Sequence, residues 1–169
     1  EVVKRLWTEE TVTFEGKYFQ LRDVSLTTRP VQMPRPPIVI AASNDKMIRR
    51  AASIGDAWAI AGHATFDTLQ AQVALYAQAL EEVGKPFPPK HFSQGKELFI
   101  ARDMETARRE ALPHIATKYE AYAKWGQDEV MPEGETFDLP IEKLSENRFI
   151  IGDPEYCIEQ IELHRERLQ

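Results

Sequence analysis

The most constraining feature of this sequence is a repeated alternation of short apolar runs with amphipathic helical patterns. The run at 38–41 is apolar throughout and precedes a helical pattern at 45–54, where apolar residues recur every three to four positions. Such a short apolar run is typical of a parallel strand that is covered on both faces. The order of strand and then helix occurs four times. The strands are predicted at 38–41, 57–61, 97–101 and 149–151, and the helices at 45–54, 66–83, 103–125 and from 153 onward.

This alternation predicts an α/β fold in which crossover helices join parallel strands. Two architectures satisfy it, a (β/α)8 barrel, of which the chain supplies about half, and a doubly wound open sheet. The helical pattern at 1–7 starts without a capping residue or an initiator Met, and the last helix has no stop signal before Gln169. We therefore expect a single partial domain over 1–169, truncated at both ends.

Two segments interrupt the alternation. Residues 8–36 combine an alternating apolar pattern around Glu15-Gly16, which predicts a β-hairpin, with a proline-rich connector. Residues 126–147 start with a loop rich in acids, glycine and proline and end in a short predicted helix at 141–146. A loop of this length predicts a lid or an insertion.

Composition and charge exclude several classes of function. The net charge of −6 and the isoelectric point near 5.3 argue against a nucleic acid partner, because no basic stripe is present. No apolar run approaches the ~18–20 residues that a membrane-spanning helix needs. Cys157 is the single cysteine, which excludes an intrachain disulfide and a cysteine zinc site and fits a cytoplasmic location.

The strongest candidate for a binding site is the turn that follows the strand at 38–41. Ala42, Ser43 and Asn44 stand at the C-terminal end of this strand, which is where ligands bind in both architectures. Small side chains let a ligand approach the backbone, and the unpaired amides of a helix N-terminus favour phosphate. The alternative is that Ser43 or Asn44 merely caps the helix.

The histidines offer one further candidate. His63 follows the strand at 57–61, at the same edge, and is a candidate contact for a cofactor or substrate. The alternative is a solvated loop histidine. His91 is expected to be structural, and His114 and His164 are expected to be surface or packing residues. Because no two histidines have metal-ligand spacing, no metal site is expected.

Four other residues are expected to have structural roles. Trp58 is predicted to pack in the core, and Cys157 to act as a buried small hydrophobe. Arg148 is expected to form a surface salt bridge, and the alternative is that it faces an anion. Glu135, like Glu133 and Asp138, is expected to be a solvating charge in a mobile acidic loop, and the alternative is a pair of carboxylates for acid–base chemistry.

Several motifs follow one another along nearly the whole chain. They are "LWTEE", "VTFEGKYF", the connector "RPVQMPRPPI", the small-residue strand end before Ser43, "RRAASIGDAW" and "IIGDPEYCIEQI". In this order they closely resemble the luciferase-like monooxygenase family, the bacterial-luciferase type of flavin-dependent enzyme. The resemblance implies a partial (β/α)8 TIM barrel. It places the chain in the C-terminal half, at roughly the fifth to seventh strands, without the first four strands and the eighth.

The resemblance also implies a chemistry. In that family the turn after the fifth strand helps to hold the phosphate of FMN, and the matching residues here are Ala42, Ser43 and Asn44. Many relatives have Gly-Gly-Ser at this turn, so Ala-Ala-Ser slightly hinders approach to the backbone. The implied reaction is oxygenation of a small organic substrate by reduced flavin and O2, with a flavin reductase as electron source. Some members use a deazaflavin for hydride transfer instead, and the residues leave both cofactors open.

The resemblance leaves other points open. The catalytic residues around the flavin ring are expected in the absent half, so none is named here. A homodimer is compatible with the resemblance. A non-catalytic role, as a barrel fragment that serves as a binding or assembly module, also stays open, because exposed sheet edges favour pairing with another chain.

Overall fold

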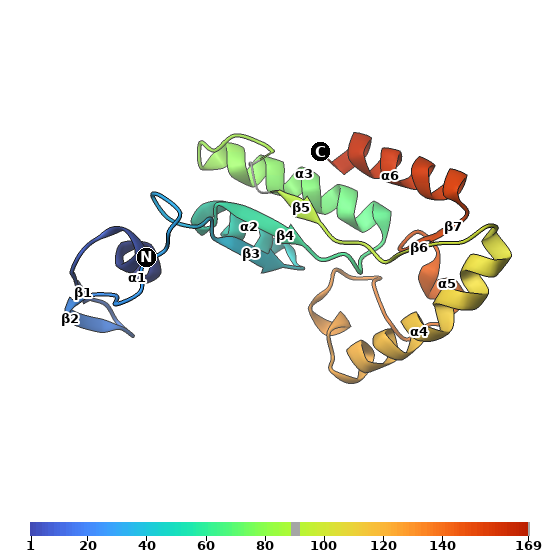
Figure 1. Cartoon of the computed structure of the whole chain (residues 1–169), viewed down its shortest axis with the longest axis horizontal. Helices are drawn as coiled ribbons and strands as arrows, with labels where there is room; N and C mark the ends of the chain where they lie inside the picture. The colour runs from blue at the N-terminus through green and yellow to red at the C-terminus, as the bar shows by residue number, and fades with distance from the viewer. Residues whose placement is uncertain (89–91, 169) are drawn as a thin grey trace. The chain divides into compact units, whose positions relative to one another are not determined.

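The computed structural model describes residues 1–88 and 92–168 and divides into two compact units, Glu1–Ile38 and Val39–Gln169. The boundary falls at the end of the proline-rich connector. In the first unit, two strands pair antiparallel around Glu15-Gly16, as the alternating pattern predicts (Figure 1). The elements of this unit are helix α1 (Val2–Thr8) and strands β1 (Val12–Glu15) and β2 (Gln20–Val24).

The second unit contains two sheets of parallel strands, which confirms the predicted α/β class. The first sheet has the strand order β3-β4-β5, and the second pairs β6 with β7. Ala42 aligns with Ile60, and Ile60 with Gln94, so the C-terminal ends of the strands of the first sheet lie at one edge. The strands are β3 (Val39–Ala42), β4 (Ala57–Ile60), β5 (Ser93–Gln94), β6 (Leu98–Ile100) and β7 (Ile150–Gly152).

Helices follow the strands of this unit, and short polar side chains start several of them. Thr65 caps one helix through the Thr68 amide, and Asp103 caps the next through the Thr106 amide, at 2.7 Å from Oδ1. The helices are α2 (Asp45–Ile54), α3 (Phe66–Glu82), α4 (Met104–Lys124), the 3-10 helix η1 (Asp128–Val130), α5 (Ile141–Ser145) and α6 (Pro154–Leu168).

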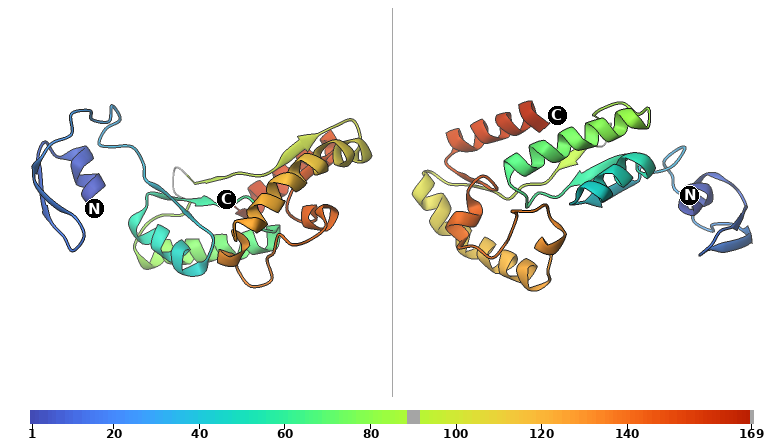
Figure 2. Two further views of the ribbon diagram at one scale, coloured as in Figure 1. Left: turned by 90° about the horizontal axis from the view of Figure 1, so that it is seen from below. Right: turned by 180° about the vertical axis from the view of Figure 1, so that it is seen from behind.

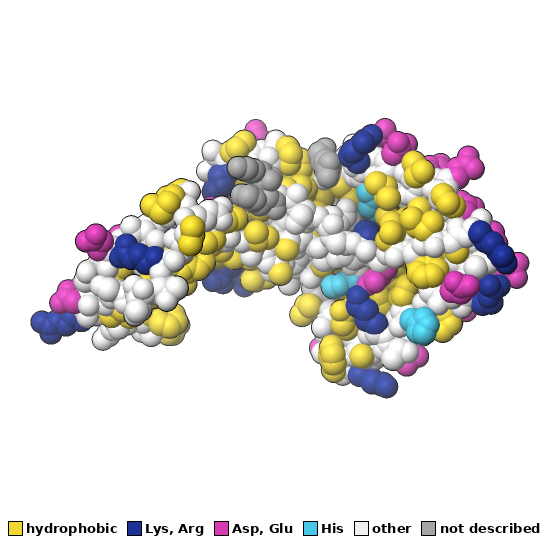
Figure 3. Space-filling view, viewed as in Figure 1, with side chains coloured by type: hydrophobic (Ala, Val, Ile, Leu, Met, Phe, Trp, Pro, Cys, Tyr) yellow, Lys and Arg dark blue, Asp and Glu magenta, His cyan; other side chains and the backbone are white. Residues whose placement is uncertain are grey.

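The helices cover the sheets and enclose one hydrophobic core. Helices α3 and α6 lie side by side, and α4 and α6 both pack on the β6–β7 pair (Figures 1 and 2). Trp58 and Tyr76 are fully buried, with ring centroids 5.2 Å apart, so the core position predicted for Trp58 is confirmed. On β6, Leu98 and Ile100 stay about half exposed, at 49% and 50%. Hydrophobic side chains gather over β6, β7 and α6 on the face shown in Figure 3.

A short strand that the sequence does not indicate, β5, precedes the predicted strand at 97–101. The strand itself is Leu98–Ile100, and it pairs with β7, the extended piece predicted at 149–151. Just before it, Ser93 and Gln94 form β5, which pairs with β4 instead. Two polar residues carry no periodic signal, so only the pairing with β4 makes them a strand.

Among the described helices, none is long and apolar enough to cross a membrane.

Candidate functional site

The turn after β3 places the predicted residues at the C-terminal edge of the first sheet. Asn44 caps α2, because its Oδ1 accepts a hydrogen bond from the Met47 amide at 3.1 Å. The capping alternative is thus confirmed for Asn44. Ser43 is partly exposed, and its hydroxyl has no hydrogen-bond partner among the residues that the structure describes. Ser43 is therefore the side chain of this turn with an uncommitted polar group.

Two buried side chains fix the backbone of this turn. The indole Nε1 of Trp58 donates to the carbonyl of Ala42 at 3.0 Å, and Nε2 of Gln72 donates to the carbonyl of Ser43 at 2.8 Å. In a trans peptide the N–H points away from the carbonyl. The amides of Ser43 and Asn44 consequently face away from these donors. Trp58 on β4 and Gln72 on α3 thus hold the turn in one orientation.

The loop after β4 begins with a close approach between two backbone segments. A Cβ atom on Gly62 would lie 1.9 Å from the carbonyl oxygen of Gly95, so only glycine fits at this position. His63 follows directly. Since β3 and β4 end at the same edge, the turn at Ser43 and the loop at His63 belong to neighbouring strand ends. No contact between these two candidates is found among the described residues.

His63 faces a cavity of about 300 Å³. Its ring packs edge-on against Phe137, at 5.4 Å between centroids, and Tyr122, at 6.2 Å. Burial is the main cause that lowers the pKa of His63, and Arg148 and two lysines add to it, while Glu135 opposes them. A neutral imidazole therefore lines this cavity at neutral pH. The other lining residues include Lys96, Glu97, Lys118 and Tyr119.

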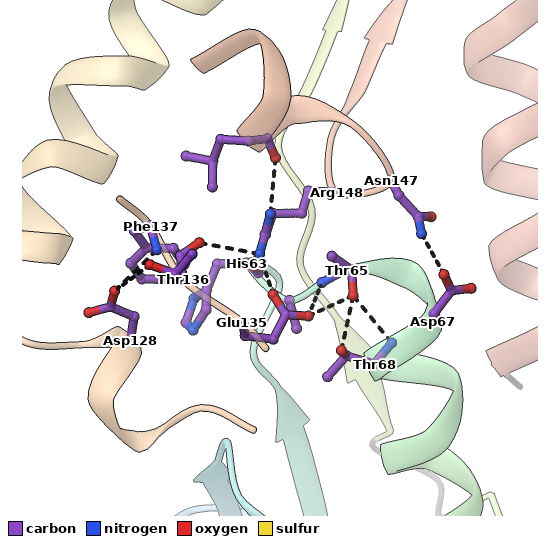
Figure 4. Close-up of polar contacts among 12 residues, drawn as sticks. His63, Thr65, Asp67, Thr68, Asp128, Glu135, Thr136, Phe137, Asn147 and Arg148 are labelled. Carbon is purple, nitrogen blue, oxygen red and sulfur yellow. Dashed lines mark hydrogen bonds and ion pairs between the residues drawn. The ribbon is translucent and has the colours of Figure 1, made fainter. Parts of the chain in front are cut away.

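A buried ion pair between Glu135 and Arg148 lies next to His63 (Figure 4). Both side chains are only 4% exposed. Arg148 also donates from Nε to the carbonyl of His63 at 3.0 Å, and Glu135 accepts from the amide and hydroxyl of Thr65 at 3.0 and 2.6 Å. Burial alone would raise the pKa of Glu135, but these hydrogen bonds and the charge of Arg148 hold it below its ordinary value.

Both sequence expectations for this pair are wrong. Arg148 does not make a surface salt bridge, and Glu135 is not a solvating charge, although Glu133 and Asp138 of the same segment are exposed as expected. The sequence contains only a weak indication that Arg148 is buried. Arg148 stands directly before the apolar run at 149–151, so a charged residue adjoins a buried strand.

Lys96 lines the same cavity as His63. Its Nζ donates to the carbonyl of Ala64 at 3.0 Å. We predict that Lys96 titrates at a pKa of about 8, below 10.5, because burial disfavours its charged form and Arg148 repels it. Between pH 8 and 10.5, Lys96 is then protonated in the unfolded chain but largely deprotonated in the folded protein. The contribution of Lys96 to the free energy of unfolding therefore increases as the pH rises from about 8 to 10.5.

Two measurements check the titration of Lys96. Lysines methylated with ¹³C should include one NMR resonance that titrates near pH 8 and is absent from a Lys96→Met variant. The free energy of unfolding of the unmodified protein, relative to that variant, should be higher at pH 10 than at pH 7. A Lys96 resonance that titrates only above pH 10 would contradict the prediction.

The remaining candidates have the structural roles expected of them. His114 is exposed on α4, and His164 packs edge-on against Phe66 at 4.8 Å. Cys157 is 1% exposed, and burial raises the pKa of its thiol, as expected for a buried small hydrophobe. His91 lies outside the described residues. Within residues 1–88 and 92–168, no group of three or more His, Cys, Asp or Glu side chains is arranged to hold a metal ion.

Comparison with known proteins places these observations in a family. The family described as luciferase-like monooxygenase matches residues 1–168. An F420-dependent glucose-6-phosphate dehydrogenase from Kineococcus radiotolerans is 40% identical over 57 residues, which are 34% of this chain and 16% of that protein.

Two solved structures share the fold. One is the coenzyme F420-dependent tetrahydromethanopterin reductase of Methanopyrus kandleri, with a TM-score of 0.74, 17% identity, and coverage of 98% of this chain and 52% of that one. The other is the oxygenating constituent of 3,6-diketocamphane monooxygenase from Pseudomonas putida, in complex with FMN, with a TM-score of 0.68, 19% identity, and coverage of 99% and 51%. The chain thus spans about half of each structure, and its fold is a partial (β/α)8 barrel.

Proposed function

Because the chain belongs to the luciferase-like monooxygenase family, we propose that it is the part of a flavin-dependent monooxygenase that holds the phosphate of reduced FMN. The turn of Ala42, Ser43 and Asn44 is the proposed phosphate site, and His63 is the proposed contact for the flavin or the substrate. The observation that carries the proposal is the fixed turn at the C-terminal end of β3, whose amides face away from the donors behind them.

The residues of the turn fit a phosphate in two respects. The Ser43 hydroxyl can donate to a phosphate oxygen, and the positive end of α2 lies beside it. One residue opposes binding, because Asp45 puts a negative charge in the first turn of α2. Ala42 is buried, so its methyl group points into the core rather than toward a ligand. We therefore expect moderate affinity for the phosphate.

We assign separate roles to the residues that follow β3 and β4 and to the flavin itself. Reaction with O2 is the chemistry that reduced flavin supplies when bound. The protein would hold the phosphate at Ser43 and present the neutral imidazole of His63 toward the small organic substrate or the ring. We further propose that a separate flavin reductase supplies the electrons and that two copies of the enzyme pair.

A second candidate is a deazaflavin-dependent oxidoreductase of the same fold. It is favoured by the relative that is 40% identical over 57 residues, because that protein is named as F420-dependent. F420 also carries a phosphate, so the same turn would hold it. The two candidates differ in the ring and in the use of O2, and both are tested by one titration series.

A Ser43→Asp variant is expected to weaken cofactor binding by roughly 5- to 1,000-fold. The added carboxylate would stand about 4 Å from the phosphate, where two negative charges repel by about 1–4 kcal/mol, depending on the local dielectric. Calorimetric titration with FMN and with F420, each oxidised and reduced, measures the change. Ser53→Asp is the matched control, because Ser53 is exposed near the other end of α2.

The outcomes separate the candidates. Saturable binding of reduced FMN that is lost in Ser43→Asp but kept in Ser53→Asp supports the monooxygenase, and O2 consumption by the loaded protein tests the reaction. Binding of F420 alone supports the second candidate. If a cooperatively unfolding protein binds neither cofactor, both proposals fail and the non-catalytic module is favoured. Equal binding by both variants would place the phosphate elsewhere.

A further inference from the structure

Charged side chains bind backbone groups of three consecutive residues, His63, Ala64 and Thr65, in the loop after β4. Each of these side chains comes from a different segment of the chain: one from between β5 and β6, one from the loop before α5, and one from the residue pair before β7. The contacts are Arg148 Nε to the carbonyl of His63, Lys96 Nζ to the carbonyl of Ala64, and Glu135 Oε1 to the amide of Thr65, each at 3.0 Å. The path of the backbone at His63 is therefore set from outside the loop (Figure 4).

The ring of His63 packs against the segment that carries Glu135. Oδ2 of Asp128 accepts hydrogen bonds from the Phe137 amide at 3.1 Å and the Thr136 hydroxyl at 3.3 Å, which closes the segment 128–137 into a compact loop. Phe137 is 4% exposed and packs edge-on against His63. The segment 128–137 thus supplies both the Phe137 ring that packs against the imidazole and the Glu135 carboxylate that binds the Thr65 amide.

The chemistry of the Glu135–Arg148 pair is unusual for a purely structural contact. Removing two charges from water is costly, and apolar residues of similar volume often give equal or higher stability at such sites. What apolar residues cannot supply is the hydrogen bond to the carbonyl of His63 and the hydrogen bond to the amide of Thr65. Arg148 supplies the first from Nε while its terminal nitrogen binds Glu135, a geometry that needs the planar guanidinium fork.

We propose that Arg148 and Glu135 are positioning residues that fix His63 at the C-terminal edge of the sheet and tie its position to the segment 128–137. The geometric part of this proposal stands on the contacts above. Its functional part, that the fixed His63 serves the cofactor or substrate, rests on the proposed function.

The test replaces the whole pair by apolar residues. In the double variant Glu135→Leu/Arg148→Met, no buried charge is left unpaired, so the protein is expected to keep a cooperative unfolding transition. The ¹H and ¹³C resonances of the His63 ring, identified with a His63→Gln variant, are expected to shift, because the carbonyl of His63 and the carbonyl of Thr136, next to Phe137, both lose their bond to Arg148. The affinity for the cofactor that the wild type binds is expected to fall about tenfold, the effect of losing one polar contact of His63.

Two further variants keep the test decisive. Arg49→Met/Glu82→Leu removes an exposed ion pair, whose side chains are 43% and 53% exposed, and should leave the His63 resonances unchanged. Arg148→Lys keeps the positive charge but loses the fork. It should shift the His63 resonances as well, and it replaces the double variant if that one does not unfold cooperatively.

The outcomes separate this proposal from the proposed function. Unchanged His63 resonances in a folded Glu135→Leu/Arg148→Met protein, or in Arg148→Lys, would overturn the positioning role whether or not a cofactor binds. Shifted resonances support that role even where the wild type binds no cofactor, in which case only the proposed function fails. Shifted resonances with an unchanged cofactor affinity would overturn the functional part.

Discussion

Replacing Arg148 alone with methionine is expected to lower the free energy of unfolding by about 3–5 kcal/mol, because it leaves the carboxylate of Glu135 buried without its counter-charge. The Glu135 side chain is 4% exposed, so water cannot take the place of the guanidinium without a rearrangement. The same substitution removes the donors to the carbonyls of His63 and Leu144, at 3.0 and 3.3 Å. Urea unfolding followed by circular dichroism measures the loss.

A control at the surface shows what burial contributes. Arg49→Met breaks the exposed pair with Glu82 and is expected to cost at most about 1 kcal/mol. The double variant Glu135→Leu/Arg148→Met should recover most of the stability that Arg148→Met loses, since neither charge is then left alone. If Arg148→Met is as stable as Arg49→Met, the pair is not buried in solution.

Replacing Gly62 with alanine is expected to destabilise the protein by about 1–3 kcal/mol or more, as overpacking of a filled site does. The added methyl carbon would lie 1.9 Å from the carbonyl oxygen of Gly95 and 2.7 Å from its carbonyl carbon. Both are backbone atoms, so no side chain can rotate away and the two loops must separate. His63 and Lys96, the next residues of these loops, would move with them, and cofactor binding should weaken as well.

Gly95→Ala is the matched control for Gly62→Ala. It lies in the same contact, but a Cβ atom there would meet no atom within 4 Å. It should therefore leave the urea midpoint close to that of the wild type. Equal midpoints for the two variants would mean that the close approach between the segments does not exist in solution.

Local elements were predicted well because their signals lie within a few residues of each other. Helix α2 has its cap at Asn44 and its buried residues Ile48, Ala51 and Ala52 on one face, and all of this is visible in the sequence. Strand β5 could not be predicted in this way. Ser93 and Gln94 form a strand only because the edge of β4 offers them hydrogen bonds.

In the candidate site, too, the local residues were predicted and their distant partners were not. The turn at Ser43 was predicted because a small-residue strand end and a helix cap are adjacent in sequence. The donors behind it, Trp58 and Gln72, lie 16 and 29 residues away from the carbonyls that they bind, and nothing in their local sequence indicates that role. His63 was predicted as a candidate, but the groups that set its pKa were not.

The sequence by itself determined the α/β class, the cap of α2 and the membership of a family, because periodicity and motif order are written along the chain. Only the tertiary structure decided which charges are buried and what they hold. Glu135 binds Thr65 across 70 residues and Arg148 binds the carbonyl of His63 across 85. The physical reason is that burial depends on which segments pack together, and a charged residue in a polar loop has the same local sequence whether water or another side chain surrounds it.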